Sequence, residues 1–331
     1  EEAELVSFVT HDKNASNRRQ RDSITIADIQ QVVFREQFVD FAQKLTGNAQ
    51  QLYASGIELF ERIPLTFEVA ESDVRLEPLI HKLCNHIRSM IKRKGVASRS
   101  LEHDVMDTVT WLIKTWRLLL EKYLNIEVEY YCRTDSVEVE VGEKAQKYQQ
   151  LFNTCGVTYL CLELIAVGMD HSVVIEAIYL LVALLMAKKG NETVQAKVAK
   201  YLCDTDSTLF FQEVGELIEQ LTLWSSKEFE GRNDDKIMYE LPDEIGVFKL
   251  LQLLCLGNFA PCQNCIRDQF GNTRVVGLVG QMATYSDVLS RLESHLCTQM
   301  CIHLVQTIHT LMMGPCKGNQ EQFVLQTELL L

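Results

Sequence analysis

The chain lacks the local patterns that identify the commonest enzymes. No serine lies in a Gly-x-Ser-x-Gly elbow, and no glycine-rich loop has the spacing of a phosphate-binding motif. A long apolar run is missing as well, because the longest one, at residues 177–187, is about half of the roughly 20 residues that a membrane span needs. We therefore expect no enzyme, no cofactor and no membrane span in this segment.

Positive charge is scarce. The 331 residues contain 32 Lys and Arg against 45 Asp and Glu, a formal net charge of −13, so we expect no nucleic-acid partner. The strongest basic patch consists of Lys92, Arg93 and Lys94 with Arg88 and Arg99. It lies near a predicted helix C-terminus, where cations complement the helix dipole. Binding of an anionic ligand or an acidic partner segment is the alternative.

A secretory signal peptide is missing too, and this bears on the eleven cysteines. Several of them, including Cys155, Cys161, Cys203 and Cys255, lie in apolar helical runs where no spacing indicates a designed crosslink. We expect a reduced, cytosolic protein in which alkylation finds nearly all eleven thiols free. The chain starts without Met and stops inside an apolar run, which indicates a piece cut from a larger protein.

What the sequence has in abundance is helical periodicity. Apolar residues recur at helical spacing from residue 25 onward, interrupted by Gly and Pro, which predicts an all-α solenoid of stacked helix pairs. Residues 126–130 and 137–141 break this pattern, because their strict alternation favours a small β-hairpin. We favour a solvated acidic loop over weak calcium binding for the four glutamates there, since they lack the spacing of a helix-loop-helix calcium site. They are Glu127, Glu129, Glu138 and Glu140.

The most apolar helix pair is predicted at residues 247–269. Its first helix is apolar on most sides and leaves only Lys249 and Gln252 to face water, so a neighbouring layer of helices must cover the rest. Gly257 and Asn258 are expected to end that helix, and Pro261 stops it from running on.

Two sequence motifs in this part of the chain resemble a known family. LLQLLCLGN and CQNCIRDQ, followed by GPCKGNQ at residues 314–320, resemble the homology-associated region of inositol trisphosphate and ryanodine receptors. Residues 144–221 are similar to the same family. The resemblance implies an armadillo-like cytosolic segment of a tetrameric calcium-release channel of the endoplasmic reticulum. Such a segment would pass a conformational shift between the ligand-binding region and the pore. Its partners would be other segments of the channel, neighbouring subunits and regulatory proteins.

With this resemblance the chain is expected to divide into six parts. They are a flexible lead-in at 1–24, a helical bundle or solenoid start at 25–125, an acidic hairpin or loop at 126–143, armadillo-like repeats at 144–225, a linker at 226–242 and the homology-associated unit at 243–331. The rival interpretation is a helical-repeat scaffold for other proteins that is not attached to a channel. The parent chain beyond Leu331 would discriminate the two, since a channel requires membrane spans and a glycine-rich filter.

The resemblance also implies the loss of a calcium site. The receptors hold a regulatory calcium ion with two glutamates, and Leu256 and Thr310 occupy their positions here. A calcium ion needs several oxygens, usually with charged carboxylates, and the nearest acidic residue, Glu293, supplies only one. We expect no calcium binding here in the micromolar range.

Two further sites are alternatives to structural roles. Cys262 and Cys265 with Cys297 and Cys301, close to His303, have the residue types of a zinc site. We favour cysteines that fill core gaps as small hydrophobic residues. His81 and His86 miss the i, i+4 spacing of a metal-binding pair.

Ser23 follows a basic run that a basophilic kinase would recognise. We favour a solvated charge cluster there.

Overall fold

The computed structural model describes residues 57, 76–92, 99–136, 138–168, 170–204, 206–230, 241–292, 294–314 and 316–326. It divides into two compact units, residues 1–83 and 84–331. In the first, only Ile57 and the start of α5 (Leu76–Lys92) are described. The predictions for the lead-in, Ser23 and Glu293 lie outside the described residues.

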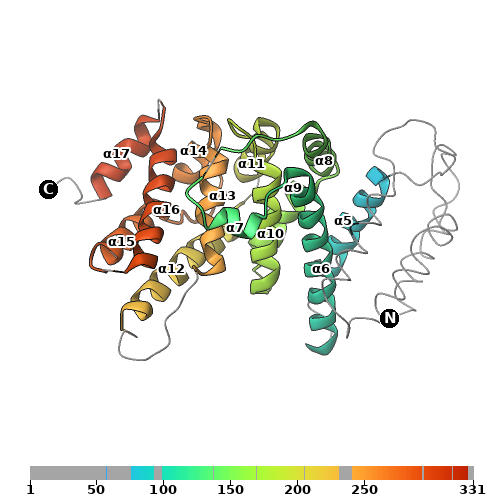
Figure 1. Cartoon of the computed structure of the whole chain (residues 1–331), viewed down its shortest axis with the longest axis horizontal. Helices are drawn as coiled ribbons and strands as arrows, with labels where there is room; N and C mark the ends of the chain where they lie inside the picture. The colour runs from blue at the N-terminus through green and yellow to red at the C-terminus, as the bar shows by residue number, and fades with distance from the viewer. Residues whose placement is uncertain are drawn as a thin grey trace, which may run out of the picture. The chain divides into compact units, whose positions relative to one another are not determined.

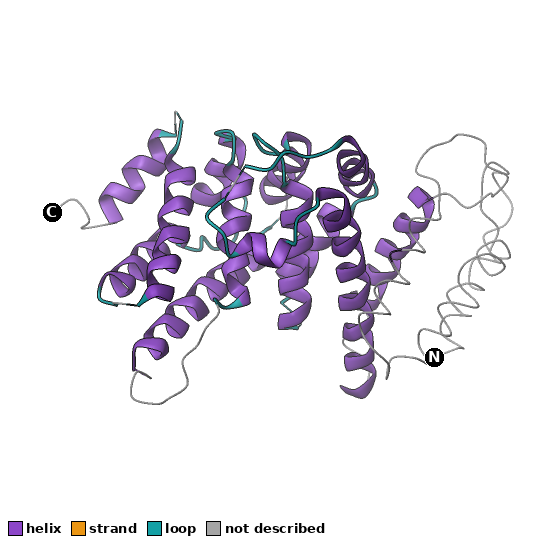
Figure 2. Ribbon diagram, in the orientation of Figure 1, coloured by secondary structure: helices purple, strands orange, loops and turns teal. Residues whose placement is uncertain are grey.

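The second unit is built from helices, and no strand occurs among its described residues (Figure 2). The all-α prediction is confirmed. In chain order after α5 the helices are α6 (Arg99–Leu124), α7 (Val128–Cys132), α8 (Glu143–Thr154), α9 (Val157–Val167), α10 (His171–Leu185), α11 (Glu192–Asp204), α12 (Thr208–Glu230), the 3-10 helix η4 (Asp243–Ile245), α13 (Gly246–Cys255), α14 (Ala260–Asp268), α15 (Leu278–Ser290), α16 (His295–Met312) and α17 (Lys317–Gln326).

The helices stack in three rows, and within each row the helices follow one another along the unit (Figure 1). One row runs from α6 through α10 and α13 to α16, a second from α9 through α12 to α15, and a third from α11 through α14 to α17. The repeated unit is therefore three helices, α8–α10, α11–α13 and α14–α16, where the sequence predicted pairs. The solenoid itself is confirmed.

Local sequence explains where these helices begin and end. The side chain of Asp170 accepts a hydrogen bond from the backbone N–H of Ser172 and starts α10, and Ser294 caps α16 in the same way. Gly168 ends α9 in the left-handed conformation. Every residue of α10 from Val173 to Leu185 is buried, because α6, α9 and α13 pack around it.

The helix predicted to be most deeply buried, α13, is covered on all sides. All ten of its residues are buried, which includes Lys249 and Gln252 at 0% exposure. The prediction that these two face water was wrong. The reason is that residues 133–136 and α16 cover the face that carries them.

The predicted β-hairpin was also wrong. Residues 128–132 form α7, and residues 138–142 are an irregular loop. Val128, Tyr131 and Cys132 are the buried residues of α7, at the i, i+3, i+4 spacing of a helix. The alternation of apolar and polar residues ends at Tyr130. The next two residues, Tyr131 and Cys132, are both buried, which a helix allows and an alternating strand does not.

No single helix among the described residues is both long and apolar enough to cross a membrane, and α8 with α9 meets the test only as a pair bent by 63°.

We predict that Leu254→Ala lowers the free energy of unfolding by about 2–5 kcal/mol, because the side chain is 0% exposed and its removal leaves a cavity. Urea unfolding of the 331-residue chain measures it. Leu209→Ala, at a side chain 60% exposed, is the matched control and should change stability by less than about 0.5 kcal/mol. A loss below about 1 kcal/mol at Leu254 would contradict a central place for α13.

Candidate functional site

The two sequence motifs, about fifty residues apart, meet in space. Gln263 and Arg267 lie on α14 and Asn319 lies on α17. The amide of Asn319 donates to the Gln263 carbonyl (3.3 Å) and to the Leu311 carbonyl (2.8 Å), while Arg267 donates to Asn319 Oδ1 (2.9 Å). A Cβ on Gly318 would overlap the Arg267 guanidinium, so a larger residue here would displace the end of that side chain. The motif residues thus clamp α14, the end of α16 and α17 together.

At the centre of this cluster is the fully buried side chain of Gln263. Its amide Nε2 donates to the carbonyls of Thr310 (3.0 Å) and Met313 (2.9 Å) at the end of α16. The last carbonyls of a helix have no partner within it, so a buried helix end needs donors from elsewhere. Gln263 supplies two such bonds from one side chain.

The same arrangement recurs in the two preceding repeats. Gln149 on α8 donates to Ala183 and Met186 at the end of α10, at 2.8 and 3.0 Å. Gln195 on α11 donates to Leu253 and Leu256 at the end of α13, both at 2.9 Å. In all three repeats a glutamine of the first helix binds the C-cap carbonyl of the third helix and the carbonyl three residues before it. We call Gln149, Gln195 and Gln263 the capping glutamines.

The turns that follow these helix ends stack on one another. Gly190, Gly257 and Gly314 have φ values of 88°, 76° and 79°. A Cβ on Gly190 would lie 2.9 Å from the Leu256 carbonyl oxygen, and one on Gly257 would overlap the Lys189 carbonyl. Both the left-handed backbone and the close approach of the neighbouring turn require glycine at Gly190 and Gly257. The stack of turns therefore connects the three repeats along one edge.

The family model described as "RyR and IP3R Homology associated" matches residues 244–330, the part of the chain that contains α13 to α17. This part of the chain is therefore similar to the homology-associated region of ryanodine and inositol trisphosphate receptors. The resemblance of the motifs in this homology-associated region is confirmed, while that of residues 144–221 stays a prediction.

Leu256 and Thr310, the two positions that the resemblance matches to the receptors' calcium ligands, both lie near helix ends. Leu256 is the C-cap of α13, and its carbonyl is occupied by Gln195. Thr310 donates its hydroxyl to the Gln306 carbonyl (2.8 Å), and its own carbonyl accepts from Gln263. Neither side chain offers a carboxylate. In the part of the chain that the structure describes, no three His, Cys, Asp or Glu residues form a group that could hold a metal.

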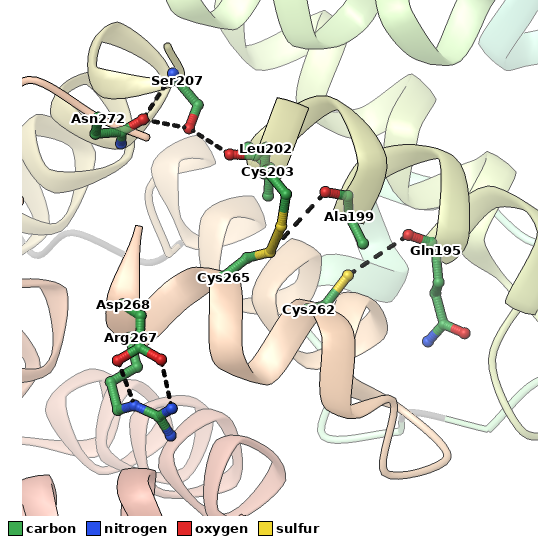
Figure 3. Close-up of a disulfide and its surroundings, with 10 residues drawn as sticks. All are labelled: Gln195, Ala199, Leu202, Cys203, Ser207, Cys262, Cys265, Arg267, Asp268 and Asn272. Carbon is green, nitrogen blue, oxygen red and sulfur yellow. Dashed lines mark hydrogen bonds and ion pairs between the residues drawn. A yellow bond between two sulfur atoms is a disulfide. The ribbon is translucent and has the colours of Figure 1, made fainter. Parts of the chain in front are cut away.

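The cysteines of the suggested zinc site are not gathered in one place. Cys265 forms a disulfide with Cys203, and Cys262 directs its Sγ to the Gln195 carbonyl at 3.6 Å (Figure 3). Cys297 is buried on α16, and Cys301 is half-buried there. In this structure the four cysteines are not gathered as zinc ligands; nine cysteines are free, while Cys203, which was expected to be free, is paired with Cys265. Burial raises the pKa of Cys262 to about 12, which fits a core-filling thiol.

A strap covers one face of the homology-associated region. We define it as the described residues 125–136 and 138–142, which contain α7. The ammonium group of Lys249 donates to the carbonyls of Thr134 (2.9 Å) and Ser136 (2.8 Å) and lies 4.8 Å from the ring centroid of Tyr131. Burial lowers the pKa of Lys249 to about 8. The carbonyls and the ring thus replace the water that this buried cation has lost.

The strap also reaches α16. His303 contacts the Arg133 carbonyl through Nε2 at 3.2 Å, and Gln306 donates to the Asp135 carbonyl at 3.1 Å. Burial lowers the pKa of His303 to about 4, so its ring is neutral at pH 7 and Nε2 carries the proton that the carbonyl accepts. Helices α13 and α16 therefore hold alternate carbonyls of the four strap residues 133–136.

The start of the strap is held by a buried ion cluster. Arg117 on α6 is 1% exposed and donates to Glu176 on α10 (2.9 Å), Glu121 (2.6 Å) and Glu129 of α7 (2.6 Å). Glu129 is thus engaged by an arginine, and Glu140 pairs with Lys188 at 2.9 Å. The four glutamates suggested for weak calcium binding do not form a common site among the described residues.

Sequence reasoning missed the capping glutamines and Lys249. A signal for the first was present, because a Gly-Asn pair precedes both Gln195 and Gln263 by a few residues. The acceptors, however, lie up to 61 residues away from each glutamine.

We predict that Gln263→Leu lowers the free energy of unfolding by about 1–3 kcal/mol, because the fully buried amide loses its two hydrogen bonds to the partly buried carbonyls of Thr310 and Met313, each of which contributes about 0.5–1.5 kcal/mol. Gln320→Leu is the matched control. Gln320 also donates to two carbonyls near the end of α16, but it is exposed, so water replaces it and the change should stay below about 0.5 kcal/mol. Equal losses in the two variants, measured by urea unfolding, would contradict the capping role.

Proposed function

We propose that this chain is a cytosolic segment of an inositol trisphosphate or ryanodine receptor-like calcium-release channel, where it transmits conformational change between a ligand-binding region and the pore. Residence on the cytosolic face of the endoplasmic reticulum, a tetrameric assembly and the armadillo-like nature of the repeats belong to this proposal. So do contacts with neighbouring subunits and regulatory proteins, and the division of the chain into a repeat unit before residue 226 and a unit after residue 242.

The observation that carries the proposal is the strap on the homology-associated region. Its start is bound to α6 and α10 through Arg117, and its later part to α13 through Lys249 and to α16 through His303. Helices of successive repeats are thus tied to one short segment. A shift of α16 relative to α10 must break discrete buried polar contacts. Elements of this kind have separate packed arrangements, which favours rigid-body transmission of a shift over gradual sliding.

The rival function is a scaffold that binds other proteins and has no pore. The channel proposal requires that the parent chain contain membrane spans of roughly 20 apolar residues and a glycine-rich filter. The scaffold predicts neither. Reading the parent chain therefore separates the two before any protein is made.

We predict that Lys249→Met in the parent channel reduces calcium flux at saturating agonist by about fivefold or more, while agonist still binds. The reason is that the strap loses its buried attachment to α13. Flux from reconstituted vesicles and agonist binding to the same preparation give the two measurements.

Lys188→Met is the matched control for that experiment. Lys188 also contacts the strap, but through an exposed ion pair with Glu140, which contributes little. Unchanged flux in Lys249→Met, with circular dichroism showing a folded chain, would contradict the transmitting role of the strap.

Calcium binding gives a separate prediction. We expect no heat of binding at micromolar calcium in titration calorimetry of the chain, because Leu256 and Thr310 supply no carboxylate and their carbonyls already accept hydrogen bonds. A micromolar isotherm that Glu293→Gln abolishes would contradict this and would identify a replacement ligand.

A further inference from the structure

The disulfide joins corresponding helices of two successive repeats. Cys203 is at the end of α11 and Cys265 is on α14, at a sequence separation of 62 and with 6.5 Å between their Cα atoms. Figure 3 shows the bond between the two helices. A covalent bond here links two repeats that otherwise touch only through side chains and turns.

The two sulfurs differ in their access to solvent. Cys203 is exposed, whereas Cys265 is 3% exposed and its Sγ lies 3.9 Å from the Ala199 carbonyl. Eight of the nine free cysteines of the described residues are buried and the ninth, Cys301, is half-buried. Cys203 is thus the most exposed cysteine residue among them, which favours exchange with a dissolved thiol or disulfide at this pair.

Other contacts hold the two cysteines near each other without the disulfide. Asn272, in the loop after α14, accepts hydrogen bonds from the backbone N–H (2.8 Å) and the hydroxyl (2.9 Å) of Ser207. The same hydroxyl also lies 2.9 Å from the Leu202 carbonyl, next to Cys203, and shares its single proton between the two acceptors. Reduction would therefore leave the thiols within reach of each other, which is what a reversible crosslink requires.

The crosslinked helix is the one that carries the motif residues. Gln263 and Arg267 are two residues before and two residues after Cys265. Through them α14 holds the end of α16 and α17. A crosslink at Cys265 therefore restrains α14, the helix that holds the end of α16 and α17.

We propose that Cys203 and Cys265 form a redox-responsive crosslink that is open in the reducing cytosol and closes when low-molecular-weight disulfides such as glutathione disulfide accumulate, fixing α14 to α11. That the pair is open under resting conditions depends on the cytosolic location proposed above, because cytosolic disulfides are usually transient or regulatory. The chemistry of the pair does not depend on that placement.

Closure is a two-electron exchange. The thiolate of Cys203 attacks one sulfur of glutathione disulfide, forms a mixed disulfide and releases one glutathione thiolate. The thiolate of Cys265 then attacks the Cys203 sulfur, so that the protein disulfide forms and the second glutathione thiolate leaves. Two protein thiols are oxidised, one glutathione disulfide is reduced to two thiols, and the two protons pass to solvent or to the released thiolates.

The first test equilibrates the purified 331-residue chain in a series of glutathione buffers, quenches it with acid and alkylates the free thiols. Peptide mass spectrometry should find the Cys203–Cys265 pair free at the reduced end and crosslinked at the oxidised end, while Cys262 is alkylated throughout once the chain is unfolded. A pair that stays open in pure glutathione disulfide, or stays closed in pure glutathione, overturns the proposal. Because location plays no part in this titration, its failure leaves the proposed channel function standing.

The second test measures the effect on α14. Amide hydrogen exchange of residues 260–268 should be slower by about threefold or more in the oxidised chain than in the reduced one. Cys203→Ser, at an exposed position, should abolish the difference, and Cys301→Ser, at a free half-buried cysteine, should preserve it. Equal exchange in both redox states of the unaltered chain would show that the bond restrains nothing, and would also overturn the proposal.

Discussion

The three repeats of the described solenoid share one constraint, which is that the C-terminal carbonyls of their third helices need hydrogen-bond donors from outside the helix. A carbonyl that leaves water without a partner costs about 1–3 kcal/mol, and each helix end carries several. Gln149, Gln195 and Gln263 answer this need in the same way, by spanning two carbonyls three residues apart. Because the glutamine belongs to the first helix and the carbonyls to the third, each bond pair also fixes the geometry of a whole repeat.

The strap also connects the repeats. It is held by the buried cations Lys249 and Arg117, whereas the helices within each repeat are held by glutamine amides. Burying the ammonium of Lys249 or the guanidinium of Arg117 is costly unless partners compensate for the lost water. The two strap carbonyls and the three glutamates are those partners, so an altered strap position would leave a buried cation unpaired. Such contacts contribute less to net stability than to a unique arrangement of the strap on α6, α10, α13 and α16.

Periodicity and two short motifs were enough to predict the all-α solenoid and the homology-associated region, since both depend on residues close in sequence. Periodicity and motifs failed for residues whose burial depends on a segment that is distant in sequence. A helical pattern places Lys249 on the polar side of α13, and only the strap, more than a hundred residues earlier, makes that side buried. The strict alternation before Tyr131 imitates a strand for the same reason, because burial against α10 and α13 is invisible locally. The pairing of Cys203 with Cys265 likewise follows from the contact of α11 with α14, which no local spacing encodes.

The capping glutamines bind the two positions that the resemblance matches to the family's calcium ligands. Leu256 and Thr310 lie at the ends of α13 and α16, the adjacent third helices of two repeats. In this chain the carbonyls of both residues accept from an amide, Gln195 for the first and Gln263 for the second. A cation at this place would compete with these amides for the same oxygens and would find no carboxylate in either side chain to offset its dehydration. The ends of α13 and α16 are therefore each held to the first helix of their own repeat by a donor that belongs to the protein itself.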